Sequence, residues 1–116
     1  MKYFNLNEFD SPDFPNSGVN MDKDFLERLE QAREIAGIPF RITSGFRTES
    51  HNKEVGGVPN SSHIIGVAAD IAVSGGADRY IILSALIKAG FKRIGVAKTF
   101  IHCDTDSNKS NSVWTY

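Results

Sequence analysis

The chain has 116 residues, of which 41% are hydrophobic, and this size and composition suit one domain with a modest core, residues 1–116. Its formal net charge of −1 gives no basic surface, so we expect no nucleic-acid partner. No apolar run reaches the roughly 18 residues of a membrane span, and a single cysteine excludes an internal disulfide framework. We expect a monomer.

The first part of the chain predicts an arm, a helix and a strand. Turn-forming residues dominate residues 1–18, which predicts an irregular N-terminal arm. A long helix is expected from a cap at Asn20 to Ala36, because apolar residues recur on one face and Gly37 ends the pattern. Residues 40–44 then read as a strand.

The second part predicts a similar alternation of helices and strands. The expected elements are a short helix at 48–55 capped by Thr48, a strand opened by Asp70 at 70–73, a long helix at 78–89, a hairpin of strands at 94–97 and 100–104, and a polar tail at 105–116. The predicted fold is therefore α+β, with two main helices packed against a small, mostly antiparallel sheet.

Three residues could bind one divalent metal ion, and we call His63, Asp70 and His102 the ligand set. Three protein ligands leave a fourth position for water, which distinguishes a catalytic zinc site from a structural one. On one continuous helix, His63 and Asp70 would lie roughly 10 Å apart along the axis. Because bonds to a common ion are about 2 Å long, the segment must fold back, and Gly66 permits this turn.

The predicted strand at 100–104 brings a second carboxylate close to the ligand set. Strand alternation places His102 and Asp104 on one face and turns Cys103 to the other, where a small buried core residue is expected. A carboxylate beside a metal ligand can act as general base, or it can fix the orientation of the imidazole. Both roles are open for Asp104.

Three motifs carry a family resemblance: S-G-F-R at 44–47, S-x-H-x-x-G-x-A-x-D at 61–70, and I-H-x-D at 101–104. Their arrangement resembles the M15 zinc peptidases over about residues 21–104. That group includes D-alanyl-D-alanine carboxypeptidases, vancomycin-resistance dipeptidases and phage endolysin peptidases. Its fold is shared by the hedgehog signalling domain, so the resemblance implies a hedgehog/DD-peptidase-like fold.

The resemblance also implies roles for single residues. The ligand set would bind Zn²⁺, Arg47 would anchor a substrate carboxylate or carbonyl, and Ser61 would contact the substrate. Because Arg47 follows a predicted strand, at a loop mouth, we expect it to serve substrate binding and not stability. Many family members place an acidic base three residues before the last histidine, where this chain has Thr99. We assign the base to Asp104 in its place.

The function implied by the resemblance is zinc-dependent hydrolysis of amide bonds in peptidoglycan stem peptides, by a carboxypeptidase or an endopeptidase. A zinc-holding binding or signalling module without turnover is the alternative, because Thr99 cannot act as a base. Residues 1–8 lack the apolar core of a signal peptide. We therefore expect synthesis in the cytoplasm and delivery to the cell wall by a holin, by lysis or by a virion, as for a phage-encoded enzyme.

Overall fold

One five-stranded sheet organises the chain in the computed structural model, which describes residues 1–116. In spatial order the strands are β1 (Ile42–Ser44), β2 (Ala68–Ala72), β4 (Phe100–Asp104), β3 (Arg93–Val96) and β5 (Ser112–Thr115). The first four pair antiparallel, and β5 pairs parallel with β3. The predicted α+β class with a small, mostly antiparallel sheet is confirmed.

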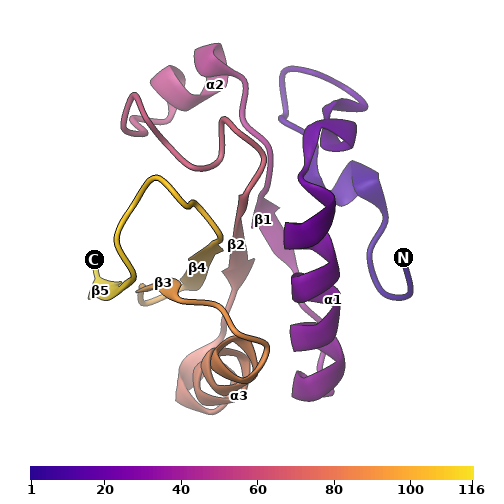
Figure 1. Ribbon diagram of the computed structural model, residues 1–116, viewed down its shortest axis with the longest axis vertical. Coiled ribbons are helices and arrows are strands. Elements are labelled where there is room, and N and C mark those ends of the chain that lie inside the picture. Colours follow the sequence, from indigo (N-terminus) through magenta and orange to yellow (C-terminus); the bar gives the residue numbers. More distant parts are fainter.

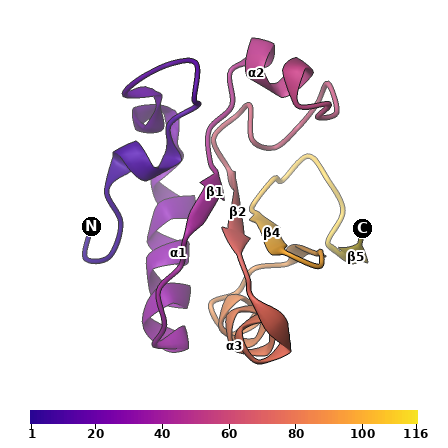
Figure 2. The ribbon, with the colours of Figure 1, turned by 180° about the vertical axis from the view of Figure 1, so that it is seen from behind.

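Two long helices pack on each other and beside the sheet, α1 (Lys23–Ala36) and α3 (Gly75–Lys88). Figures 1 and 2 show α1 running along the sheet, α3 viewed almost end-on, and the short α2 (Glu49–Glu54) at the opposite end from α3. Two 3-10 helices, η1 (Leu6–Phe9) and η2 (Ser17–Asn20), precede α1. None of the helices is both long and apolar enough to cross a bilayer.

The hydrophobic core lies between the two long helices and one face of the sheet. Ile71 of β2 and Ile101 of β4 are fully buried in it, and so is Cys103, as predicted. Burial raises the pKa of the Cys103 thiol well above its ordinary value. Because side chains alternate along a strand, Asp70 and His102 point to the opposite face, away from the helical layer.

Two predicted helix boundaries differ from the structure. The cap of α1 is Asp22, whose carboxylate accepts a hydrogen bond from the Phe25 N–H at 2.9 Å, and not Asn20. The Asn20 side chain donates instead to the carbonyl of Ser17 within η2. The second long helix begins at Gly75, three residues before the predicted start. Gly75 and Gly76 therefore form the first residues of this helix.

The N-terminal arm is more ordered than its turn-forming composition indicated. Phe4 and Phe9 are buried in the core, with their rings packed edge to face at 5.6 Å between centroids. The Phe9 carbonyl accepts a hydrogen bond from the Phe46 N–H at 2.8 Å. A Cβ at Gly45 would lie 2.7 Å from the Phe9 Cα, so only glycine allows this approach. The arm therefore supports the segment that leads out of β1.

This packing predicts a large stability difference between two phenylalanines of the arm. Phe9→Ala should lower the free energy of unfolding by about 3–5 kcal/mol, because it empties a fully buried site. Phe14, which is 54% exposed, is the matched control, and Phe14→Ala should change stability by no more than about 0.5 kcal/mol. Urea unfolding of both variants measures this. Equal stability of the two would mean that the arm does not belong to the core.

Candidate metal centre

The pairing of β2 with β4 brings two members of the ligand set together. Asp70 lies directly opposite His102 in the antiparallel register. The Nδ1 atom of His102 is 2.9 Å from Oδ1 of Asp70. Asp70 is the third residue of β2 and not, as the sequence had predicted, the residue that opens it. Both Asp70 and His102 therefore lie within paired strands, which fix where their side chains point. Rigid strands thus position a carboxylate and an imidazole on one face.

His63 reaches the same place from the loop before β2. The predicted reversal at Gly66 is confirmed, with φ at +74°. A side chain at this position would also place its Cβ 2.3 Å from the Asn20 carbonyl oxygen, which leaves room only for glycine. The turn directs Nε2 of His63 to a point 3.4 Å from Oδ1 of Asp70.

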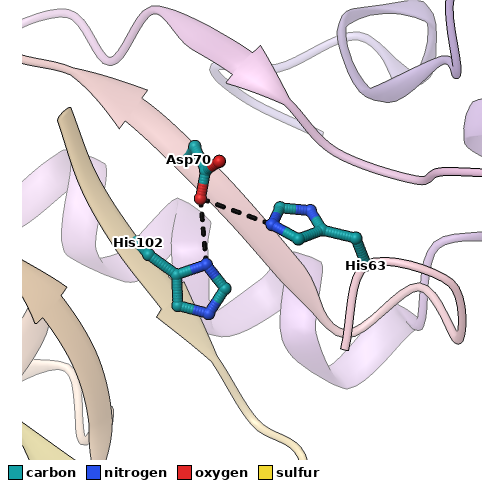
Figure 3. A group of neighbouring side chains, drawn as sticks. All are labelled: His63, Asp70 and His102. Atoms are coloured by element: carbon teal, nitrogen blue, oxygen red, sulfur yellow. Dashed lines mark hydrogen bonds and ion pairs between the residues drawn. The ribbon is translucent and has the colours of Figure 1, made fainter. Parts of the chain in front are cut away.

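The three side chains form one buried cluster, in which the potential ligand atoms all lie within 4.8 Å of one another. Figure 3 shows both imidazoles pointing at the same oxygen of Asp70. Two nitrogen donors and one carboxylate oxygen are a set that suits Zn²⁺. The sequence therefore identified three residues that the fold brings together.

The hydrogen bonds around the cluster fit metal binding. Nδ1 of His63 donates to the Gly45 carbonyl at 2.7 Å, so Nε2 is the nitrogen that faces Asp70 and is available to a metal ion. Nε2 of His102 lies 2.7 Å from Oδ2 of Asp104, which leaves Nδ1 facing Asp70. Histidines that ligate metals are commonly oriented in this way, through a hydrogen bond on the nitrogen that is not the ligand.

The electrostatics of the cluster favour a positive charge between its members. Burial raises the pKa of the Asp70 carboxyl, but hydrogen bonds from His102 and His63 lower it more, so the pKa lies below its ordinary value. Burial likewise lowers the pKa of His102, and the hydrogen bonds to Asp104 and Asp70 raise it above its ordinary value. A site with these preferences attracts a cation, whether a proton or a metal ion.

Asp104 lies behind His102 and does not face the other ligands. Its side chain is 1% exposed, and both oxygens have partners. Oδ1 accepts from Nε of Arg93 at 2.8 Å and from the Asp106 N–H at 3.0 Å, whereas Oδ2 faces His102. Burial raises the pKa of this carboxyl, but these hydrogen bonds bring it below its ordinary value. The contacts favour orientation of the imidazole over the role of general base.

Arg47 contacts the carboxylate of the cluster from the other side. Its Nη2 is 3.6 Å from Oδ2 of Asp70, the oxygen that does not face the histidines. Nε donates to the Ser44 hydroxyl at 3.0 Å, and Nη1 donates to the Asn52 side chain at 3.2 Å. With a side chain only 15% exposed, Arg47 connects β1, β2 and α2 in addition to lining the site.

An open groove of about 420 Å³ has the ligand set at its floor. Its lining also includes residues 55–58, Trp114 and Tyr116. Ser61 also borders the groove, where its hydroxyl accepts from the His63 N–H at 3.2 Å. The two aromatic residues lie in or beside β5, within the tail predicted to be polar. Trp114 and Tyr116 are two residues apart, so on a strand they share one face, and this pattern could have predicted β5.

A family comparison agrees with this geometry. The sequence profile of Peptidase M15 matches residues 3–104, which include the whole ligand set. The chain belongs to the M15 peptidase family. M15 peptidases are typically zinc-dependent metallopeptidases. The match includes the N-terminal arm and ends at Asp104, so β5 lies beyond it. A search of curated proteins gives no significant match to the chain.

The contacts of Arg47 predict a loss of stability on its removal, contrary to the expectation from the sequence. Arg47→Ala deletes two hydrogen bonds and leaves the buried Asp70 carboxylate without its cation. The free energy of unfolding should fall by about 1–3 kcal/mol. Arg41→Ala, at an exposed position of the same segment, is the control. Chemical unfolding of both variants tests this, and unchanged stability of Arg47→Ala would restore a role in substrate binding alone.

Proposed function

We propose that this M15 peptidase is zinc-dependent and hydrolyses amide bonds in peptidoglycan stem peptides, as a D-Ala-D-Ala carboxypeptidase or a cell-wall endopeptidase. One observation carries the proposal: a buried His-Asp-His cluster with oriented imidazoles lies at the floor of an open groove. Family membership adds the peptidase chemistry. We propose in the same way that the protein acts on the cell wall.

The ligand atoms would be Nε2 of His63, Oδ1 of Asp70 and Nδ1 of His102, since each faces the same point. A bound zinc ion would supply Lewis-acid polarisation of the scissile carbonyl and a lowered pKa of water, towards about 7. Arg47 contacts the second oxygen of Asp70 and so helps to orient this carboxylate. The groove walls would align the peptide over the cluster, with Ser61 as a further polar contact.

For Asp104 we now propose orientation of His102. The carboxylate is buried behind the imidazole, and its oxygens already contact Arg93, Asp106 and His102. A general base must come within hydrogen-bonding reach of the proton that it accepts. Asp104 contacts Nε2, on the edge of the His102 ring that is turned away from the cluster, so it fits the supporting role.

A non-catalytic zinc-holding module is the second candidate, and one observation favours it. Asp70 is the only acidic residue that lines the groove, and it belongs to the ligand set. Thr99 is exposed in the turn between β3 and β4, so no carboxylate occupies the position of the base in many relatives.

Zymography on purified cell wall separates the two candidates. A catalyst should clear the wall, lose this activity with a chelator and recover it with added zinc. Mass spectrometry of the released peptides then distinguishes loss of a terminal D-alanine from internal cleavage. Zinc-dependent binding to the wall without any released peptide would support the second candidate.

The ligand assignment predicts which histidines matter for metal content. His63→Ala and His102→Ala should each lose the single zinc ion of the wild-type protein, because two protein ligands remain. His51 is the matched control, since it lies on α2 outside the cluster, and His51→Ala should bind one zinc ion per chain. Elemental analysis after dialysis against limiting zinc measures this. Full zinc content in both cluster variants would contradict the assignment.

The two roles of Asp104 predict different outcomes for Asp104→Asn. If the carboxylate orients His102, zinc affinity should weaken by about 10- to 100-fold, and excess zinc should restore activity. If it is the general base, zinc affinity should stay near wild type while turnover falls roughly 10²- to 10⁴-fold. Activity measured against added zinc distinguishes these cases. We expect the first.

A further inference from the structure

The C-terminal strand β5 lies outside the family match but reaches the metal centre. One row of directly opposed residues crosses the strands: Gly95 of β3 lies between His102 of β4 and Trp114 of β5. Because Gly95 has no side chain, the indole of Trp114 passes over it. A Cβ at Gly95 would lie 2.5 Å from Nε1 of Trp114. The indole thereby contacts the His102 ring, with 5.4 Å between the ring centroids.

Trp114 also contacts the cation that supports Asp104. The guanidinium carbon of Arg93 lies 4.9 Å from the centroid of the indole, within the range of a cation–π interaction. The same guanidinium donates to Asp104 through Nε, and through Nη1 to the carbonyl of Ser110, just before β5. Arg93 is therefore fixed between the carboxylate and the C-terminal segment.

These contacts converge on one imidazole from two directions. The His102 ring packs against the tilted indole of Trp114, and at Nε2 it contacts the carboxylate that Arg93 anchors. Both restraints act against rotation of the ring about its side-chain bonds. Since Nδ1 must face Asp70 for ligation, a rotated ring would present the wrong atom to the metal.

We propose that Trp114 and Arg93 are positioning residues of the metal centre, which together keep Nδ1 of His102 directed at the zinc site. This inference rests on the proposed zinc-dependent function. It makes β5 a functional part of the centre in addition to a wall of the groove. The residues act through His102 and do not themselves contact the metal.

The test compares the zinc affinity of variants by competition with a chromophoric chelator. Trp114→Leu and Arg93→Gln should each bind zinc about 10-fold more weakly than wild type, the lower end of the range for groups that orient a ligand. Trp114→Phe and Arg93→Lys should recover part of this loss, because they keep an aromatic face and a positive charge. Arg79→Gln is the control, since Arg79 on α3 donates only to the carbonyl of Lys98.

Cobalt substitution adds a measurement that a purely structural role would not change. The visible spectrum of bound Co²⁺ reports coordination geometry, so Trp114→Leu should alter the band intensity at saturating cobalt, whereas Arg79→Gln should not. Melting temperatures of the metal-free proteins identify any variant that fails to fold. Trp114→Leu leaves the Asp104–Arg93 pair intact and so provides the test if Arg93→Gln unfolds.

The outcomes separate this inference from the proposed function. Wild-type zinc affinity and an unchanged cobalt spectrum in folded Trp114→Leu would overturn the positioning role while leaving zinc binding intact. A wild-type protein that binds no zinc would overturn the proposed function itself, and with it the inference. Weaker binding with an altered spectrum, in Trp114→Leu but not in Arg79→Gln, supports the proposal.

Discussion

The antiparallel register between β2 and β4 is the constraint on which the candidate metal centre depends. It sets Asp70 opposite His102, so a carboxylate and an imidazole meet through backbone pairing and not through loop conformation. The same row continues from Ser44 of β1 to Gly95 and Trp114. Slipping the register by one residue would turn one of the two partners into the hydrophobic core. The hydrophobic pattern of the strands fixes the register, and the register keeps Asp70 and His102 on the same face of the sheet.

A second constraint is the balance of charge around His102. Two buried carboxylates contact its two nitrogens, and each carboxylate also contacts an arginine, Arg47 for Asp70 and Arg93 for Asp104. Burying a carboxylate is costly unless a cation and hydrogen bonds compensate it. The hydrogen bonds to the histidines supply much of that compensation, and the arginines lie beside the carboxylates without entering the space between the ligands. Both carboxylates thus remain ionised, and one oxygen of Asp70 stays directed at the cluster.

Local patterns were sufficient to predict much of this molecule. The ligand set followed from residue chemistry and motif spacing, the turn at Gly66 from a distance argument, and the burial of Cys103 from strand alternation. These inferences depend on neighbours in the sequence. Such predictions succeed because the backbone geometry of a turn or a strand limits where the side chains of nearby residues can point.

Other features depend on contacts between distant segments, and the sequence did not reveal them. The burial of Phe9 requires a glycine at position 45, and the position of Trp114 requires a glycine at 95. Neither dependence is visible in composition. The N-terminal arm and β5 were accordingly underestimated, since polar and turn-forming residues masked the few apolar side chains that attach each segment. The predicted hairpin placed β3 beside β4, but the strand begins one residue earlier than predicted, so the pairing of Arg93 with Asp104 was not inferred.

The division of the ligands between strands and a loop has a consequence for how such a scaffold can diversify. Asp70 and His102 are set by the sheet, so the connections that border the groove can lengthen or change sequence without moving them. His63 lies on a loop and is held by the turn at Gly66 and by local hydrogen bonds, among them those with Gly45 and Ser61, so changes beside it are the least tolerated. Substrate preference can therefore evolve at residues 55–58, whereas β5 is constrained by the contact of Trp114 with His102, and the peptidase chemistry is inherited with the strands.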